Sequence, residues 1–272
     1  MSKYRDFYGL TGRPFGKIPP QNRPYLYAQL DELIDHFEVI LEDGGIGVLT
    51  GEVGIGKTTA IRTFLSKLDQ GAYHLFYIGN TRHPRAILRA LIESFGASSP
   101  HLKADMLFAA GKLISRAFIE RRIRTVCVID EVHLIEDTFI EDLRLLTNFE
   151  MDSLDPLALI LVGHPSLRAR LRQPIHAALA DRLTLQYRLE GLSAEETLHY
   201  IDEHMQQAGA QKGIFQPKAA YAIFDYAQGI PRRINRIALM CLLKGVAPKI
   251  NPITAEHVAH VIASLDANEK KR

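Results

Sequence analysis

Apolar residues follow two alternating patterns up to about residue 190, and only one of them continues after it. Before residue 190, short and almost wholly apolar runs alternate with segments whose apolar residues recur every three or four positions. The first pattern predicts buried strands and the second predicts helices. The alternation favours a parallel sheet with helices on both faces. The predicted strands are 46–50, 73–78, 125–130, 157–162 and 185–189, and the predicted helices are 30–41, one ending at 68, 84–95, 102–120 and 139–149.

Beyond residue 190 the pattern predicts helices alone. Ser193 and Glu196 have the spacing of a capping box, which begins a helix. Pro217 stands at a favoured first-turn position, and Gly229 is expected to end that helix. Thr254 is a candidate N-cap for the last helix. The two remaining helices are predicted at 230–244 and 255–265.

These patterns divide the chain into four parts. Residues 1–28 are rich in Gly, Pro and aromatic residues, and we predict an irregular arm there rather than a helix. Such an arm either wraps a domain, closes a base pocket or packs as a plain surface extension. An α/β domain is predicted at 29–190, a helical lid at 191–265 and a frayed tail at 266–272.

The composition is that of a globular protein with a sizeable core. Of 272 residues, 47% are hydrophobic and 24% are charged. The N-terminus lacks the apolar stretch of a signal peptide, and no apolar run approaches the roughly 18 residues that span a membrane. We therefore expect a cytoplasmic protein without a membrane partner. Cys127 and Cys241 lie in apolar runs, which favours reduced core residues over a disulfide.

Charge is distributed unevenly although the net charge is only +2. Residues 82–124 hold nine basic and three acidic residues, for a net charge of +6. Residues 130–155 hold nine acidic residues and one basic residue, for a net charge of −8. Such blocks suggest that two surfaces meet two different partners.

The strongest motif begins at Gly51, between a predicted strand and a predicted helix. The segment GEVGIGKT fits the phosphate-binding pattern G-x-x-x-x-G-K-[ST] at every fixed position. In such a loop, backbone N–H groups and the helix N-terminus surround the phosphates of ATP. Lys57 is expected to neutralise the β- and γ-phosphates, and Thr58 to bind Mg²⁺. The predicted ATP-binding residues are Gly51, Glu52, Val53, Gly54, Ile55, Gly56, Lys57, Thr58 and Thr59.

Two carboxylates follow the apolar strand at 125–130. Asp130 at its end is placed to hold Mg²⁺, and Glu131 can act as the general base toward an attacking water. An acidic start of a helix would be an ordinary reading of this pair alone. Together with the phosphate loop, however, it favours an Mg²⁺-dependent ATPase.

Three more residues are candidate catalytic groups. His164 follows the strand at 157–162 and is a candidate sensor of the γ-phosphate, the alternative being a surface-loop histidine. Arg182 could reach the nucleotide of a neighbouring subunit as an arginine finger. Arg232 begins a lid helix, where its charge opposes the helix dipole, and a broken local rule of this kind suggests a function at the γ-phosphate. Arg168, Arg170 and Arg172 are competitors for the finger role and are interpreted as solvated charges. Arg233 and Arg236 are interpreted as DNA-facing or solvated.

The segments GEVGIGKTT, VIDEVHLI, LVGHP, ADRL and GIPRRINR occur in the order found in AAA+ ATPases, which the chain resembles. The opening FYGLTGRPF followed by YLY resembles the ExeA-like ATPases, a group similar to the transposition helpers MuB, TniB and TnsC. This chain has DEVH and GHP where ExeA-like members have DEAQ and GQP. The secretion-type members continue into a membrane span and a wall-binding domain, which we do not expect for this chain, and this favours the transposition-helper interpretation.

That resemblance implies a ring or helical filament of identical subunits on duplex DNA. The protein would recruit and activate a transposase, with a targeting adaptor as a further option, and would hydrolyse ATP to disassemble. The implied DNA-contacting residues are Arg82, Arg85, Lys103, Arg121 and Arg122.

Two alternative functions stay open at this stage. One is an ExeA-like secretion-assembly or protein-remodelling ATPase that does not act on DNA. The other is a nucleotide switch that binds ATP and barely turns it over.

Overall fold

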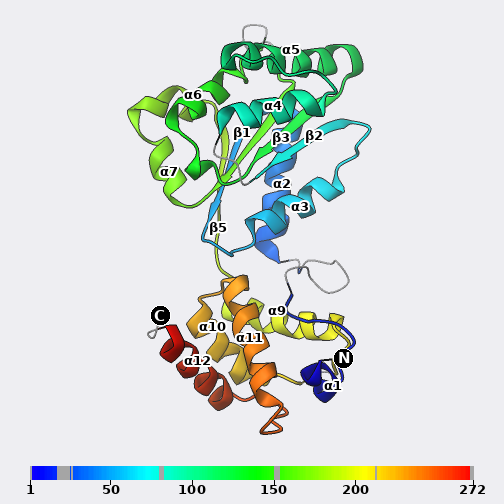
Figure 1. Ribbon diagram of the computed structural model, residues 1–272, viewed down its shortest axis with the longest axis vertical. Helices are drawn as coiled ribbons and strands as arrows, with labels where there is room; N and C mark the ends of the chain where they lie inside the picture. Colours follow the sequence, from blue (N-terminus) through cyan, green and yellow to red (C-terminus); the bar gives the residue numbers. More distant parts are fainter. Residues whose placement is uncertain are drawn as a thin grey trace. The chain divides into compact units, whose positions relative to one another are not determined.

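The structure is a computed structural model, and it describes residues 2–16, 25, 27–79, 83–149, 154–211 and 213–269. Its described residues form two compact units (Figure 1). The α/β unit comprises Gln29–Val53 and Lys57–Leu189. The helical unit comprises Met1–Ala28, Gly54–Gly56 and Glu190–Arg272. The chain therefore changes from one unit to the other at residue 190, where the apolar pattern changes.

Five parallel strands make the sheet of the α/β unit, in the order β2-β3-β4-β1-β5. Because β3 and β1 flank β4, segments that are far apart in sequence meet at the carboxyl ends of these three strands. This confirms the predicted parallel sheet, with each strand within two residues of its expected bounds. The strands are β1 Gly45–Gly51, β2 Tyr73–Ile78, β3 Arg124–Ile129, β4 Leu157–Gly163 and β5 Leu183–Leu189.

Helices cover both faces of this sheet, as predicted. On one face, Phe37 of α2 packs against Phe64 of α3, and Gly47 of β1 lets Ile40 approach the sheet. On the other face, side chains from β1, β3 and β4 join helices α4 to α8 in one buried cluster. The helices are α2 Ala28–Asp43, α3 Lys57–Lys67, α4 Pro84–Ser94, α5 Lys103–Arg121, α6 Asp137–Leu145, α7 Ser166–Leu171 and α8 Ala177–Ala180.

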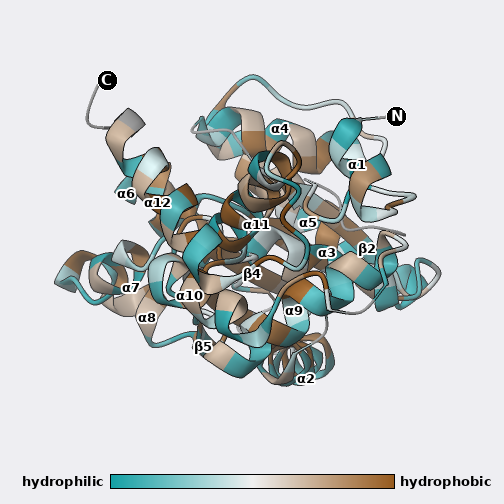
Figure 2. Cartoon of the chain, turned by 90° about the horizontal axis from the view of Figure 1, so that it is seen from below, coloured by the Kyte–Doolittle hydropathy of each residue, from teal (hydrophilic) through white to brown (hydrophobic). Residues whose placement is uncertain are grey.

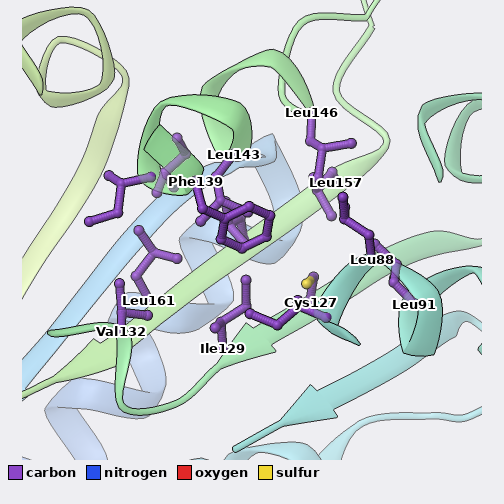
Figure 3. Packing of buried hydrophobic residues seen from close by; sticks show 14 of the residues in the cluster. Leu88, Leu91, Cys127, Ile129, Val132, Phe139, Leu143, Leu146, Leu157 and Leu161 are labelled. Carbon is purple, nitrogen blue, oxygen red and sulfur yellow. The ribbon is translucent and has the colours of Figure 1, made fainter. Parts of the chain in front are cut away.

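Figure 3 shows part of the buried cluster that β1, β3 and β4 form with helices α4 to α8. Phe139 and Leu143 of α6 lie over Leu157 and Leu161 of β4, and Cys127 of β3 lies toward α4. All five side chains are almost fully buried. The hydropathy of the elements agrees with their burial (Figure 2). The central strand β4 is apolar throughout, whereas α2 also carries exposed hydrophilic residues.

Of the five helical segments described between β3 and β5, four were missed and one was placed late. The 3-10 turns η2 Val132–Leu134 and η4 Pro174–His176, and the helices α7 and α8, were not predicted. None of them exceeds six residues, so none shows a recognisable apolar period. The helix α6 begins at Asp137, two residues before its first buried residue.

The helical unit contains four longer helices whose ends were mostly predicted. Ser193 and Glu196 form the expected capping box, and the Thr254 hydroxyl accepts a hydrogen bond from the N–H of His257 at 3.3 Å. Gln228, rather than Gly229, is the first left-handed residue after α10, with φ 52°. The helices are α9 Ala194–Gln207, α10 Pro217–Ala227, α11 Pro231–Gly245 and α12 Ala255–Glu269.

The predictions for both ends of the chain were wrong in part. A helix, α1 Lys3–Tyr8, lies within the predicted irregular arm and ends at Gly9, whose φ is 67°. It forms because Tyr4 and Tyr8, one turn apart, are both buried in the core of the helical unit. At the other end α12 continues to Glu269, where a frayed tail was expected from 266. Tyr226 donates a hydrogen bond to Asp266 at 2.6 Å, which holds this extra turn.

Cys127 and Cys241 are free and buried, as predicted. Burial raises the pKa of each thiol to about 12, so neither is an activated nucleophile. Within the described ranges, the helices are too short or too polar to pass through a bilayer.

A buried histidine makes the stability of the helical unit depend on pH. His204 stacks near Phe15 and Tyr200, and burial lowers its pKa from 6.5 to about 4. The native state then favours neutral His204, while the unfolded chain takes up a proton below pH 6.5. Stability is therefore expected to fall by on the order of 3 kcal/mol as the pH drops from 6.5 to 4.

Urea unfolding followed by circular dichroism would measure this loss. His204→Gln should flatten the pH dependence, whereas His199→Gln on the exposed side of the same helix should leave it unchanged. An equal pH slope in the two variants would assign the effect to other groups.

Candidate active site

The phosphate loop connects β1 to the first turn of α3. Gly54 and Gly56 have φ of 86° and 112°, which only glycine adopts without strain. The Lys57 ammonium is nearly buried and donates hydrogen bonds to the carbonyls of Gly51 at 2.7 Å and Glu52 at 3.1 Å. The lysine is thus held inside the loop that would surround the phosphates.

Asp130 meets the phosphate loop although β4 lies between their strands. The Thr58 hydroxyl donates to Asp130 Oδ2 at 3.0 Å, and the N–H of Glu131 donates to Oδ1 at 2.8 Å. Asp130 is only 4% exposed, so these bonds hold a carboxylate that has lost most of its water. The structure therefore brings together the two residues predicted to bind Mg²⁺.

Tyr77 is a third partner of Asp130 that the sequence did not reveal. It lies near the carboxyl end of β2, next to β3, and its hydroxyl donates to Asp130 Oδ2 at 3.0 Å. Burial and then the charge of Asp130 raise the Tyr77 pKa to about 12, which keeps it a donor at neutral pH. Only the order of the strands could have identified it.

Tyr77→Phe is expected to raise the Mg²⁺ concentration for half-maximal ATP hydrolysis by about threefold to tenfold. Losing a hydrogen bond to a ligating carboxylate costs metal affinity, and partial exposure of Tyr77 reduces the effect. Steady-state rates over a Mg²⁺ titration would measure it. Tyr73→Phe at the start of the same strand is the control, and a shift of equal size there would contradict the role given to Tyr77.

Glu131 occupies a backbone conformation that is rare for its residue type. Its φ is 59°, in the left-handed region, and such strain is characteristic of functional positions. Its carboxylate lies 3.5 Å from His133 Nδ1. That nitrogen accepts a hydrogen bond from the N–H of His164 at 3.2 Å, and burial is the main cause that lowers the His133 pKa. His133 is therefore a neutral neighbour of Glu131, and the sequence gave it no role.

His164 follows β4 and lies beside the phosphate loop. Its Nε2 is 3.5 Å from Glu52 Oε2, and its Nδ1 accepts from the N–H of Ser166 at 3.3 Å. The ring of His164 lies 5.8 Å from that of His133. The carboxyl ends of β1, β3 and β4 thus gather Lys57, Thr58, Asp130, Glu131 and His164 in one place.

The two remaining predicted catalytic arginines differ in position, since Arg182 lies away from the phosphate loop and Arg232 contacts it. Arg182 precedes β5, whose first residue pairs with Ile46 near the start of β1. It therefore lies at the amino ends of the strands, whereas the phosphate loop lies at their carboxyl ends. It also donates to Thr147 Oγ1 at 3.4 Å. In the helical unit, the N–H of Arg232 donates to the carbonyl of Gly54 at 3.2 Å, and the Arg232 side chain is exposed.

Two predictions about basic residues need correction or qualification. Arg170 is not a solvated charge, because it binds Asp137 at 2.6 Å and two backbone carbonyls. Lys103, a predicted DNA contact, forms an ion pair with Asp142 inside the chain. Among the other predicted DNA contacts, Arg82 lies outside the described residues, and the exposed ones are Arg85, Arg121 and Arg122.

Comparison with known proteins identifies the fold. Residues 40–171 match a family model described as an AAA domain. The ORC2 protein of Aeropyrum pernix in its ADP form aligns with a TM-score of 0.68 at 17% identity, covering 93% of this chain and 73% of that one. The fold is that of an AAA+ ATPase. The RuvB motor of Thermotoga maritima aligns to the AAA+ fold of this chain with a TM-score of 0.57 at 17% identity, covering 87% of this chain and 68% of RuvB.

A curated relative lies closer in sequence. General secretion pathway protein A of Aeromonas hydrophila is 34% identical over 259 residues, covering 90% of this chain and 45% of the relative. The chain thus spans less than half the length of that protein. The match supports the ExeA-like part of the resemblance, and the AAA+ fold indicates a nucleotide-hydrolysing ATPase. The transposition-helper part gains no support from these comparisons.

Proposed function

We propose that the chain is the ATPase part of an ExeA-like protein, and that its Mg²⁺-ATP cycle drives assembly or remodelling of a protein partner in secretion. The observation that carries the ATPase activity is the contact of Thr58 with Asp130 beside the strained Glu131. The choice of a protein partner over DNA rests on the 34% identity to general secretion pathway protein A. This interpretation replaces the transposition regulator as the favoured function.

The donor set at the loop suits Mg²⁺. Thr58 and Asp130 offer oxygen atoms within 3.0 Å of each other, and hydroxyl and carboxylate oxygens are ligands that Mg²⁺ prefers. When bound, the ion would supply positive charge against the phosphates. Lys57 would exchange its loop carbonyl partners for phosphate oxygens, which are stronger acceptors. Glu131 would orient the attacking water and take its proton.

Completion of the site by a second subunit is part of the proposal. Arg182 precedes the amino end of β5, whereas the phosphate loop follows the carboxyl end of the neighbouring β1, so Arg182 lies away from the site of its own chain. As a finger it would serve the nucleotide of a neighbouring copy in a homo-oligomer. His164 would sense the γ-phosphate through its place beside Glu52, and Arg232 would act at the γ-phosphate through its place beside Gly54.

The DNA-binding regulator is kept as a second candidate because Arg85, Arg121 and Arg122 are exposed. A structure of Drosophila ORC bound to DNA aligns with a TM-score of 0.68 at 18% identity, which shows a shared fold. Phosphate contacts by exposed arginines would make binding fall steeply with salt. The ion pair of Lys103 with Asp142 removes one of the predicted contacts from this account.

ATPase assays with and without duplex DNA decide between the two candidates. We expect Mg²⁺-dependent turnover that duplex DNA leaves within about twofold, and no ATP-dependent DNA binding at 150 mM salt. ATP-dependent binding that Arg121→Glu with Arg122→Glu abolishes would instead establish the DNA function. Absent turnover with tight ATP binding would indicate a nucleotide switch.

A further inference from the structure

The turn that carries Glu131 is held by groups outside the phosphate site. It leaves β3 through the left-handed Glu131 and continues as the 3-10 turn η2 to α6. Within the turn, the N–H of Leu134 donates to the carbonyl of Glu131 at 2.9 Å. A non-glycine residue keeps this conformation only where its surroundings fix it. The question is therefore which groups fix the turn.

Arg170 of α7 makes the most direct contacts with this turn. Its guanidinium donates to the carbonyls of Ile135 at 2.5 Å and His133 at 3.4 Å. The same group binds Asp137 Oδ1 at 2.6 Å, at the first residue of α6. A planar guanidinium can serve three acceptors at once, which a lysine ammonium on its flexible stem does less well. Arg170 of α7 thus binds both the turn, at His133 and Ile135, and the start of α6, at Asp137.

His176 holds the carboxylate that Arg170 uses. Its side chain is fully buried, its Nε2 lies 2.7 Å from Asp137 Oδ1, and its Nδ1 lies 3.2 Å from Glu141 Oε1. Hydrogen bonds from His176 and then from Arg170 lower the pKa of Asp137, so this carboxylate stays charged. Both acids lie on α6 one turn apart, and η4 is thereby fixed to α6.

We propose that Arg170 and His176 are positioning residues for hydrolysis that hold the turn that places Glu131. Arg170 acts on the turn directly and through Asp137, and His176 acts through Asp137. Their contacts run to the turn and to α6, whereas Lys57 and Thr58 hold the phosphate loop. Nucleotide binding and water activation thus depend on two sets of contacts that meet at Asp130. This inference rests on the proposed role of Glu131 as general base.

The test is a split between catalytic rate and nucleotide affinity. Arg170→Ala is expected to lower kcat roughly ten- to hundredfold, because small misplacement of a catalytic group has effects of this size. The Kd for ATP should stay within about twofold. Arg172→Ala, an exposed neighbour just beyond α7, is the matched control and should keep the wild-type kcat.

A double mutant separates positioning from general loss of structure. In a Glu131→Gln background the residual rate no longer depends on where the carboxylate lies, so adding Arg170→Ala should change it by less than about twofold. A further loss as large as in the wild-type background would overturn the proposal. So would an unchanged kcat in Arg170→Ala, or a fall in ATP affinity equal to the fall in rate.

A second variant covers the case in which Arg170→Ala does not fold. Asp137→Asn keeps the shape of a half-exposed side chain and removes the charge that Arg170 and His176 share. It should show the same split between kcat and Kd, and a wild-type kcat would overturn the proposal. Failure of the proposed function is distinguishable, because the wild-type chain would then hydrolyse no ATP at all.

Discussion

Glu131→Gln is expected to lower the ATPase rate at saturating ATP by about a hundred- to ten-thousandfold. Glutamine has nearly the same shape as glutamate and can hold the left-handed backbone equally well, but its amide accepts a proton far less readily. The contacts of Lys57 with the loop and of Thr58 with Asp130 do not involve Glu131. ATP affinity should therefore stay within about twofold of the wild type.

Single-turnover hydrolysis and equilibrium ATP binding would measure the two quantities separately. Glu136→Gln is the matched control, since Glu136 is exposed and lies five residues along the same connection between β3 and α6. It should retain the wild-type rate. A Glu131→Gln protein that keeps more than half of the wild-type turnover would show that another group activates the water.

The parts of the site that lie within one segment could be predicted from the sequence. The phosphate loop needs glycines at Gly54 and Gly56 and a lysine after them, so its chemistry is written in consecutive residues. Asp130 was expected to lie beside the loop because carboxyl ends of parallel strands share one edge of a sheet, and its bond to Thr58 agrees with that expectation.

The parts that depend on neighbouring strands could not be predicted. Tyr77 reaches Asp130 only because β2 pairs with β3, and the sequence does not give that order. Arg170 looked like a solvated charge among other arginines, since its acceptors lie on a turn 33 to 37 residues earlier. Lys103 of α5 likewise forms its ion pair with Asp142 of α6, 39 residues later in the sequence. Charge patterns along a chain do not reveal such pairing.

The misjudged chain ends have the same cause. Six residues of α1 are too few for a helix to form alone, so the helix depends on burying Tyr4 and Tyr8 against the helical unit. Glycine and proline nearby favoured the irregular interpretation, although Gly9 is the left-handed C-cap that such a short helix needs. Tertiary contacts therefore outweighed local preference at both ends.

Lys57→Ala is expected to weaken ATP binding by about ten- to hundredfold. A hydrogen bond to a charged group contributes about 1.5–3 kcal/mol, and each 1.4 kcal/mol is a factor of ten in affinity. Removing the ammonium should not destabilise the protein without nucleotide, because burial of this charge is itself unfavourable and Lys57 is only 8% exposed. Lys67→Ala, at the exposed end of the same helix, is the control.

Thermal unfolding with and without ATP would test both statements in one experiment. ATP at a hundred times its Kd stabilises a folded protein by about 2.7 kcal/mol, and at the same concentration the variant should retain only about 0.4–1.4 kcal/mol. The Tm without ATP should match that of the wild type. If Lys57→Ala kept the full rise in Tm, ATP would bind without the lysine of the loop. If its Tm fell without ATP, the hydrogen bonds of Lys57 to Gly51 and Glu52 would stabilise the folded protein. The main role of Lys57 would then be to hold the loop in shape rather than to bind phosphate.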